Sequence, residues 1–355
     1  MQEQYDYIII GAGSAGCVIA HRLIEQTQGR VALIEAGGQD SSPLIRMPAA
    51  VGKVIPTRTW PYMTTPHAAT QDRSMSIAQG KLVGGSSSVN GMVYIRGHRE
   101  DYDGWVRDEG CEGWGFNDLL PYFVRSEGNE SLSNPLHGTQ GPLKVSENRY
   151  RHPLSQAFIR AGQEVGLPYV NDFNDNGRQG VGYYQTTTFN GERYSSSKAY
   201  LGGLRHHPRL TILTDTEVDR VIIESGRATG VVTRQLKKGA LTLHARQQVI
   251  LSAGAIGSPK ILMHSGIKAL RHGAEWLLYR QGLMTSNVLE GGAFLDTANE
   301  GRPDTQIHFM PVLDTWDDPN GIGKGRTHGI TLKVGHLQPA SRGNVRLIGP
   351  HHDRK

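Results

Sequence analysis

Residues 5–35 read YDYIIIGAGSAGCVIAHRLIEQTQGRVALIE, and this stretch carries the strongest structural signal in the chain. Residues 5–10 form a short apolar run rich in β-branched side chains, which predicts a buried parallel strand. Residues 14–26 place their apolar side chains at helical spacing, and residues 30–35 form a second apolar run of strand length. Together the three segments predict one βαβ unit.

The turn from the first strand into the helix contains a G-x-G-x-x-G pattern made by Gly11, Gly13 and Gly16. Glu35 ends the second strand, nineteen residues after Gly16, as a dinucleotide-binding fingerprint requires. Gly11 allows the tight turn, Gly13 lets the backbone approach a diphosphate, and Gly16 lets the helix pack closely. Glu35 can accept hydrogen bonds from a ribose and would repel a 2′-phosphate, which argues against NADP. FAD and NAD both remain open at this point, as does a glycine-rich turn that only packs.

The rest of the chain falls into three stretches of different character. Residues 37–115 are punctuated by Gly, Ser and Pro, which predicts short elements joined by loops. Helices are expected at 117–126 and 154–166, the second with Leu154, Phe158, Ala161 and Val165 on one face. After residue 208 a small antiparallel meander is expected to return to the parallel sheet, followed by a short helix and further strands. The expected strands are 210–214, 218–224, 229–234, 241–252, 305–311, 329–334 and 344–348, and the helix is 258–264.

Composition and charge narrow the class of protein. The chain has 355 residues, of which 37% are apolar and 20% charged, enough for a sizeable core and two domains. No Lys/Arg run dominates its formal net charge of +5, so we expect no nucleic-acid partner. Cys17 and Cys111 lack a metal-binding spacing, so neither a disulfide framework nor a metal site is expected. With no secretory signal or apolar run long enough to span a bilayer, we expect a cytoplasmic protein, with a peripheral contact to the inner membrane left open.

Two long motifs resemble the glucose–methanol–choline (GMC) oxidoreductase family, and in particular its choline dehydrogenase-like members. They are GKLVGGSSSVNGMVYIRGHREDYDGW at 80–105 and LSAGAIGSPKILMHSGI at 251–267. The resemblance implies an α/β fold: a Rossmann-like FAD-binding domain with a small antiparallel meander, plus an incomplete α+β substrate-binding domain. We place the FAD-binding domain at 1–267 and the partial substrate-binding domain at 268–355, with 151–205 left open but leaning toward the latter.

The resemblance also implies which residues hold FAD. A segment as small and flexible as 84–88 lets backbone N–H groups approach an anion, and the resemblance places it around the FAD diphosphate. Where some members of the family attach flavin through a histidine, this chain has Val89, so we expect non-covalent FAD. Ordinary core packing is the competing account for Met92 and Val93, and a plain structural strand for Val218, Ala253 and Gly254. Beyond the fingerprint, the expected cofactor-binding residues are Leu82, Gly84, Gly85, Asn90, Gly91, Met92, Val93, Val218, Ala253 and Gly254.

No catalytic base can be assigned from the sequence. Oxidising an alcohol with flavin needs a base for the hydroxyl proton, and the resemblance implies a histidine near an H-P-x-G-T-type segment. None of the fifteen histidines has that context; the pairs His206-His207 and His351-His352 resemble a surface turn and a solvated tail. Residues 275–278 resemble a segment that comes much later in members of the family, yet only a few residues separate them from 268–270. We therefore expect an internal deletion as well as a C-terminal truncation.

The sequence favours an FAD-dependent oxidoreductase that oxidises a choline-like or other primary alcohol by hydride transfer to the flavin N5 atom. Glu290 matches a stretch that contributes a carboxylate near the substrate cation in choline-acting members, although a solvated glutamate is the commoner role. Three other functions stay open: a catalytically impaired flavin-binding fragment, an FAD lyase of the hydroxynitrile lyase type, and, most weakly, an NAD-linked dehydrogenase. The electron acceptor is left unknown.

Overall fold

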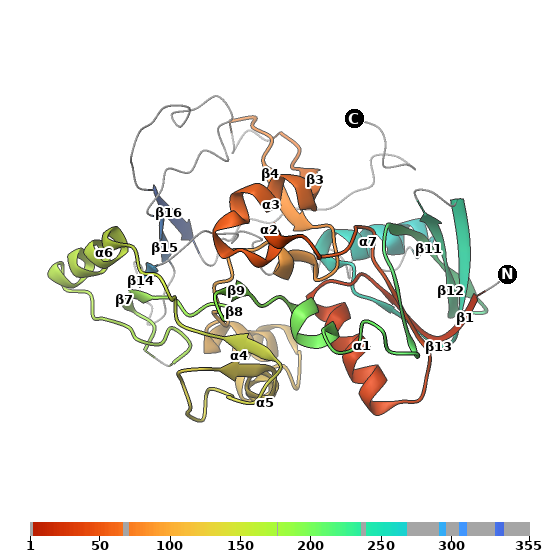
Figure 1. Cartoon of the computed structure of the whole chain (residues 1–355), viewed down its shortest axis with the longest axis horizontal. Coiled ribbons are helices and arrows are strands. Elements are labelled where there is room, and N and C mark those ends of the chain that lie inside the picture. The colour runs from red at the N-terminus through yellow and green to blue at the C-terminus, as the bar shows by residue number, and fades with distance from the viewer. Residues whose placement is uncertain are drawn as a thin grey trace.

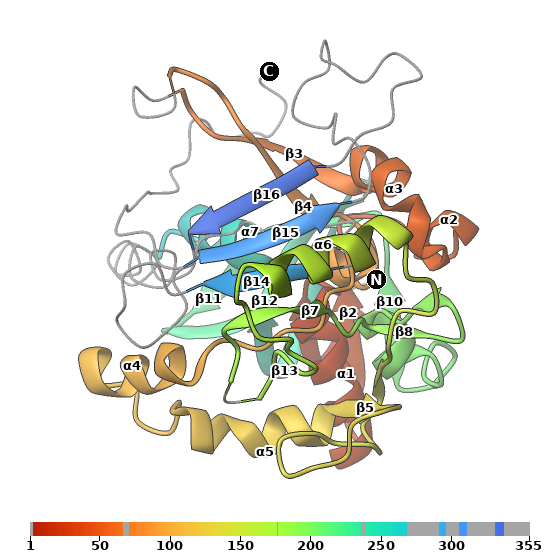
Figure 2. The same cartoon turned by 90° about the vertical axis from the view of Figure 1, so that its left-hand side faces the viewer.

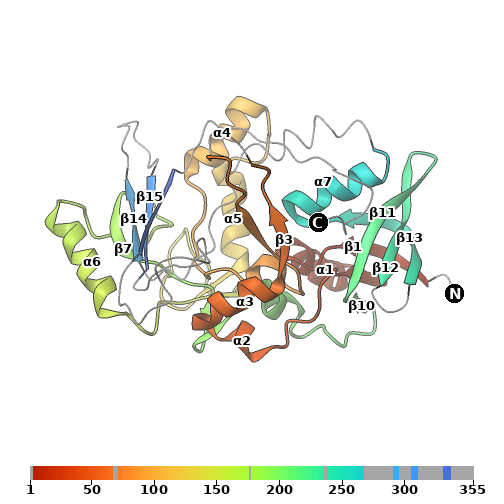
Figure 3. The same ribbon diagram turned by 90° about the horizontal axis from the view of Figure 1, so that it is seen from above.

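The structure is a computed structural model and describes residues 3–66, 71–175, 177–235, 239–267, 291–295, 305–310 and 331–336. A six-stranded sheet and a four-stranded sheet lie at opposite ends of this part of the molecule (Figures 1 and 3). The connecting segments of the first half of the chain lie between the two sheets. The protein is therefore a mixed α/β protein, as the sequence predicts.

The six-stranded sheet is built on the predicted βαβ unit. Its strands are β1 (Glu3–Ile10), β2 (Val31–Ile34), β10 (Leu210–Leu213), β11 (Thr216–Glu224), β12 (Arg227–Gln235) and β13 (Gly239–Leu251). The strand order is β10-β2-β1-β13-β12-β11, with parallel pairing from β10 to β13 and antiparallel pairing from β13 to β11. The prediction of a meander that returns to a parallel sheet is confirmed, because β13 pairs with the antiparallel β12 on one side and the parallel β1 on the other.

The core lies on both faces of β1, because successive side chains of a strand point to opposite faces. Ile9 packs on the side of helix α1 (Ser14–Gln26), with Ala20 and Ile24 of that helix. Ile8 and Ile10 pack on the other side, in a cluster with Ile261 of helix α7 (Gly254–His264). Ile8 and Ile9 are fully buried, and each such side chain stabilises the fold by roughly 1.5–3 kcal/mol.

The four-stranded sheet is antiparallel throughout and is covered by one helix. Its order is β16-β15-β14-β7, and helix α6 (Pro153–Glu164) lies across it (Figure 2). The strands are β7 (Gly180–Tyr183), β14 (Gly291–Leu295), β15 (Thr305–Met310) and β16 (Thr331–His336). The strands expected at 305–311 and 329–334 are present, β14 was not predicted, and the strand expected at 344–348 lies outside the described residues. Because β7 pairs with β14, the segment 151–205 contributes to this second sheet.

The face predicted for helix α6 is right only at Phe158, which packs against the cluster of Ile159 and Val181. Leu154 and Val165 are 43% and 78% exposed, whereas Ile159 is buried. A β-carbon on Gly162 would lie 2.9 Å from Val181 Cγ1 of β7, so the helix packs through Phe158, Ile159 and Gly162. The sheet against which the helix packs selects this face, and helical spacing alone did not reveal it.

The segments that connect the two sheets contain more regular structure than was predicted from the Gly-, Ser- and Pro-rich sequence of residues 37–115. Helix α4 (Arg99–Glu109) was missed because its signals are caps rather than apolar periodicity. His98 Nδ1 accepts a hydrogen bond from the Glu100 backbone N–H, and Asp101 accepts one from the His98 backbone N–H at 2.6 Å. Gly110 ends the helix in the left-handed conformation, with a φ of 67°. The elements are α2 (Pro43–Arg46), η1 (Pro48–Ala50), α3 (Val51–Arg58), β3 (Thr59–Met63), β4 (Ser76–Gly80), η3 (Gly85–Ser88), α4 (Arg99–Glu109), α5 (Phe116–Ser126), β5 (Glu127–Asn129), β6 (Leu143–Val145), β8 (Thr188–Phe189), β9 (Glu192–Arg193) and η4 (Ser197–Leu201).

The described residues contain neither a membrane-spanning helix nor a metal-binding cluster. None of their helices combines the length and the apolar character that crossing a bilayer requires. The same residues bring together no group of three or more His, Cys, Asp or Glu side chains that could hold a metal ion. Cys17 and Cys111 are both free thiols, and Cys17 is buried in α1.

Candidate cofactor-binding site

Two glycine turns that are far apart in the sequence touch in the structure. The Gly84 N–H donates a hydrogen bond to the Ala12 carbonyl oxygen at 2.7 Å. A β-carbon on Gly85 would lie 2.7 Å from Gly13 Cα, closer than real β-carbons approach other atoms. The fold therefore places the Gly84-Gly85 turn directly against the turn between β1 and α1.

Each glycine of the fingerprint meets a different steric demand. Gly11 has a φ of +96°, and a β-carbon there would lie 2.5 Å from the Ser252 carbonyl oxygen. A β-carbon on Gly16 would lie 1.9 Å from the Gly11 carbonyl oxygen, so only glycine lets the helix pack this closely. A β-carbon on Gly13 would meet no atom within 4 Å. Gly13 thus faces open space, and its lack of a side chain leaves room for a ligand.

A cavity of about 440 Å³ lies where the two turns meet. Half of the residues predicted to hold the cofactor line it: Gly11, Gly13, Glu35, Gly85, Val218, Ala253 and Gly254. The other half do not line this cavity: Gly16, Leu82, Gly84, Asn90, Gly91, Met92 and Val93. Helix α1 begins at the cavity, so its N-terminus presents N–H groups and the positive end of the helix dipole to whatever binds there.

Glu35 is held at the cavity by two backbone N–H groups. Its Oε2 accepts a hydrogen bond from Ala12 at 3.1 Å, and its Oε1 accepts one from Gly37 at 2.9 Å. Burial raises the pKa of this carboxyl to about 7, although both hydrogen bonds act in the opposite direction. Glu35 as a whole is 6% exposed, and its carboxyl group is oriented by these hydrogen bonds, as an acceptor for ribose hydroxyls must be.

Sequence reasoning missed one aromatic wall of the cavity. Trp60 and Tyr62 of β3 are stacked at 5.6 Å with an interplanar angle of 8°, and the Lys81 Nζ atom lies 4.0 Å from the Trp60 ring centroid. Strand β4 supplies Gln79, which pairs with Trp60 across the β3–β4 hairpin. The only sequence signal for this wall is the alternation of aromatic residues in TWPYM at 59–63. The partner strand β4 begins only at residue 76, so the pairing of the two strands has no local signal.

The segment that follows the Gly85 turn is tightly fixed. Met92 has a φ of 63°, a strained value for a residue other than glycine. Asn90 Oδ1 accepts a hydrogen bond from the Met92 N–H at 3.1 Å, and the Met92 carbonyl oxygen accepts one from the Thr187 N–H at 2.8 Å. Val93 packs against an apolar cluster that includes Tyr184. Residues 90–93 are therefore held in a single, partly strained conformation.

Leu82 and Val89 belong to the core rather than to the cavity. Leu82 is fully buried in an apolar cluster with Val54 and Ile45, and Val89 is 3% exposed in the same cluster. The Leu82 side chain is thus enclosed by its neighbours, and its backbone carbonyl accepts a hydrogen bond from the Gly85 N–H at 2.8 Å. Leu82 therefore stabilises the Gly84-Gly85 turn through its backbone while its side chain packs in the core.

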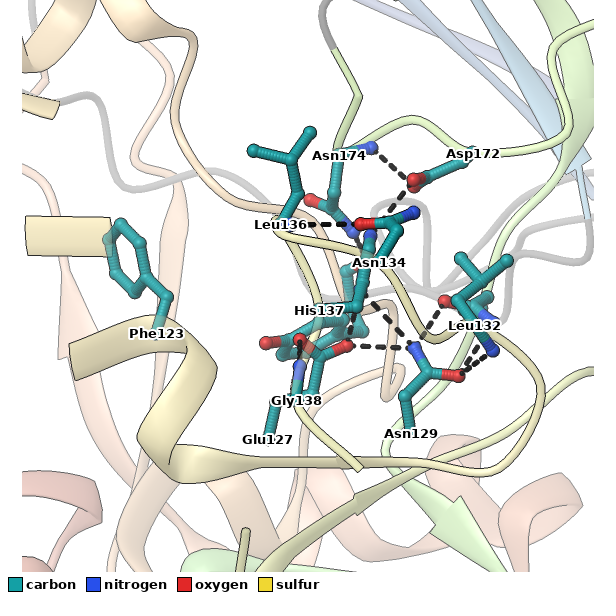
Figure 4. A network of polar contacts seen from close by, with 12 residues as sticks. Phe123, Glu127, Asn129, Leu132, Asn134, Leu136, His137, Gly138, Asp172 and Asn174 are labelled. Atoms are coloured by element: carbon teal, nitrogen blue, oxygen red, sulfur yellow. Dashed lines mark hydrogen bonds and ion pairs between the residues drawn. The ribbon is translucent and has the colours of Figure 1, made fainter. Parts of the chain in front are cut away.

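A buried polar network anchors the other end of this segment (Figure 4). Arg96 Nη2 donates to Glu127 Oε2 at 2.6 Å, and His137 lies between Glu127 at 2.7 Å and Asp172 at 2.9 Å. Burial opposes a charged imidazole, but the hydrogen bonds to Asp172 and Glu127 outweigh it and raise the pKa of His137 to about 9. The network thus balances two cations against two carboxylates, and it fixes the segment at Arg96.

The remaining sequence candidates fall on turns or outside the described residues. His206 is exposed and His207 is partly buried in the turn before β10, where His207 Nδ1 accepts a hydrogen bond from the Arg209 N–H at 3.3 Å. This matches the surface turn expected for the pair. Glu290, His351 and His352 lie outside the described residues.

Comparisons with known proteins give consistent matches along the chain. The model of the family described as GMC oxidoreductase matches residues 5–287. The oxygen-dependent choline dehydrogenase of Sinorhizobium fredii is 35% identical, over 97% of this chain and 71% of its own. That of Paraburkholderia phymatum is 37% identical, over 97% of this chain and 69% of its own. The alignment with the first spans 398 positions, more than the 355 residues of the chain, so the relative has segments without a counterpart here.

Solved structures give the same picture. Pyridoxine 4-oxidase from Mesorbium loti superposes with a TM-score of 0.84 and is 30% identical, covering 98% of this chain and 74% of its own. A mutant of formate oxidase from Aspergillus oryzae superposes with a TM-score of 0.83 at 22% identity, covering 99% of this chain and 76% of its own. The second match shows a shared fold.

Proposed function

The chain belongs to the GMC oxidoreductase family of FAD-dependent enzymes, and from this premise we propose that it oxidises a primary alcohol of the choline type. Two features support this substrate class. The curated relatives at 35% and 37% identity are choline dehydrogenases. The sequence also places a candidate cation-binding carboxylate at Glu290, whose role stays a proposal.

The residues of the cavity fit FAD. The open space over Gly13 and the close approach of Gly85 leave a backbone-lined cradle that a β-carbon on Gly13 would enter, and such cradles suit a diphosphate. We assign the diphosphate to these two turns, the adenosine ribose to Glu35 and the adenine to the backbone at Val218. Residues 90–93, fixed as described, are assigned to the flavin ring.

We propose that the flavin is held without a covalent bond. Val89 has an aliphatic side chain that cannot form such a link, and it is buried among Ile45, Ala50 and Val54. Affinity must then come from the contacts of the two turns, Glu35 and residues 90–93. When bound, FAD would supply a hydride acceptor for the alcohol at its N5 atom.

The chain's own residues supply binding, orientation and exclusion of water. Val93 of the flavin segment packs against the apolar cluster of Phe173, Tyr184 and Phe294, and we expect this cluster to exclude water from that side. The single observation that carries the proposal is the contact between Gly85 and Gly13. It brings two motifs that are far apart in the sequence to the edge of one cavity, as a single diphosphate ligand would require.

The test is an anaerobic titration of the FAD-loaded chain with choline, monitored by the visible absorbance of the oxidised flavin. The proposal expects loss of that absorbance with choline, and a weaker response to the isosteric neutral alcohol in which carbon replaces the choline nitrogen. An equal response to both alcohols would contradict the choline-type substrate. FAD binding with no response to any alcohol would favour a flavin-binding protein without turnover, which the unmatched segments of the relatives would explain.

A further inference from the structure

Arg193 ties the turn after Gly85 to a distant helix. This residue lies in β9 and is 2% exposed. Its Nε donates a hydrogen bond to the Ile45 carbonyl oxygen of α2 at 3.0 Å. Its Nη1 is within hydrogen-bonding distance of the Ser87 carbonyl oxygen at 3.2 Å and of the Asn90 carbonyl and Oδ1 atoms at 2.7 and 2.9 Å. One guanidinium therefore holds the backbone of residues 87–90 in place.

The positive charge of Arg193 has no carboxylate partner among the described residues. The neighbouring carboxylate, Glu192, contacts Lys198 at 2.7 Å and Arg46 at 3.7 Å instead. The Nη2 atom of Arg193 is buried and has no hydrogen-bond partner within the described part of the chain. Burial lowers the pKa of this guanidinium to about 10. Leaving a cation unpaired in the interior is costly, so an arginine at this place calls for a compensating negative group.

We propose that Arg193 is a positioning residue for the cofactor: although it does not line the cavity, it sets the 87–90 turn and adds a buried positive charge to the protein around the anionic FAD. This inference rests on the proposed function. Residues 84 and 85, immediately before this turn, touch the fingerprint turn at Ala12 and Gly13, where a diphosphate would lie. The carbonyl oxygens of Ser87 and Asn90 point at the guanidinium and therefore cannot point at the phosphates. Because they are turned away, they repel a bound anion less. Fixing the 87–90 turn and adding positive charge are both roles that the glycines and Glu35 do not perform.

Arg178 provides a matched control in the same chain. It is 7% exposed, and its Nη1 and Nη2 donate to the backbone carbonyls of Arg96 and Gly97 at 2.8 and 2.9 Å. Burial lowers its pKa as well. Both residues are buried guanidiniums that bind backbone oxygens, but Arg178 holds residues 96 and 97, beyond the 90–93 segment assigned to the flavin, and it contacts neither glycine turn. A purely structural effect should therefore be similar in the two.

The experiment compares FAD binding and apoprotein stability in Arg193→Lys, Arg193→Met and Arg178→Lys. Apoprotein is titrated with FAD, and the visible absorption and circular dichroism of the bound flavin are recorded. Since charge-assisted hydrogen bonds are lost, we expect the FAD dissociation constant to rise on the order of 10-fold in Arg193→Lys and about 100-fold in Arg193→Met. The ring signal should also change shape in Arg193→Lys, because the 87–90 turn moves. For Arg178→Lys we expect a lower melting temperature and a dissociation constant within roughly threefold of wild type.

Each outcome bears on one claim. Wild-type chain that takes up no FAD would refute the proposed function itself. Wild-type chain that binds FAD, with Arg193→Lys binding equally well, would overturn only the role of Arg193. Equal weakening by Arg193→Lys and Arg178→Lys would do the same, since it would mark both residues as merely structural. If Arg193→Met does not fold, the comparison of the two lysine variants decides alone.

Discussion

A β-carbon on Gly85 would lie 2.7 Å from Gly13 Cα, although the two residues belong to separate glycine motifs of the sequence. The contact is between backbones, so no side-chain movement can relieve it. It forms one wall of the 440 Å³ cavity that we assign to the cofactor. The contact of these two turns therefore shapes the wall of the cavity against which we propose that the diphosphate lies.

Replacing Gly85 with alanine should push the two turns apart and weaken FAD binding by more than about 10-fold. The residue has a φ of +53°, so alanine also adds backbone strain of about 1 kcal/mol. Fluorescence titration of apoprotein with FAD measures the loss. The control is Gly226→Ala, which has a φ of +78° but no atom within 4 Å of its β-carbon. Equal FAD affinity in Gly85→Ala and Gly226→Ala would show that the contact has no bearing on the ligand.

Gly13 and Gly16 should respond to alanine in opposite ways. Gly13 has an ordinary φ of −75° and open space at its β-carbon, so Gly13→Ala should fold normally but bind FAD poorly. Gly16→Ala would place a methyl group 1.9 Å from the Gly11 carbonyl oxygen and should lower the melting temperature of the apoprotein. Thermal unfolding with and without FAD separates the two. A stable Gly13→Ala variant with undiminished FAD affinity would rule out a ligand above Gly13.

FAD affinity should increase with pH through the titration of Glu35. Burial raises the pKa of Glu35 to about 7, and the ionised carboxylate is the stronger acceptor for ribose hydroxyls. In the apoprotein the sign is reversed: the stability linked to this group is fully present below pH 4.5 and is lost as pH rises through about 7. Glu35→Gln should remove the pH dependence and weaken binding on the order of 10-fold. The check is the FAD dissociation constant measured across that range in both proteins, and a pH-independent wild-type value would contradict it.

His137 should make the protein less stable at alkaline pH. Its pKa is raised to about 9 because it lies between Glu127 and Asp172, so its contribution is fully present below pH 6.5 and is lost as pH rises through about 9. The loss should be on the order of 3 kcal/mol, because one pKa unit corresponds to 1.36 kcal/mol. Urea unfolding of wild type and His137→Gln measures it. The variant should lack this alkaline decline, and parallel pH profiles for the two proteins would exclude His137 as its source.

The backbone of the fold could be predicted because its signals are local. The apolar runs of β1 and β2, and the helical spacing between them, are contained in residues 5–35, and the turns of the meander lie next to its strands. Helix α4 was missed because its signals are the His98 cap and Gly110 rather than periodicity. The buried face of α6 depends on Val181, which approaches only after the chain has folded.

The candidate site divides in the same way. The fingerprint glycines and Glu35 could be placed because their spacing encodes the turn itself. The aromatic wall of Trp60 and Tyr62 could not, since it depends on pairing across the β3–β4 hairpin. The hydrogen bond between Arg193 and Asn90 joins residues more than a hundred positions apart, and the sequence around either residue gives no signal of it.

The flavin content of the purified chain tests the central claim most directly. Two separate glycine turns that grip one cofactor should yield a yellow protein, and denaturation should release a single equivalent of free, unmodified FAD. Apoprotein prepared from it should take FAD up again and regain the same visible spectrum. A colourless chain that takes up no added FAD, while remaining folded by circular dichroism, would contradict the account.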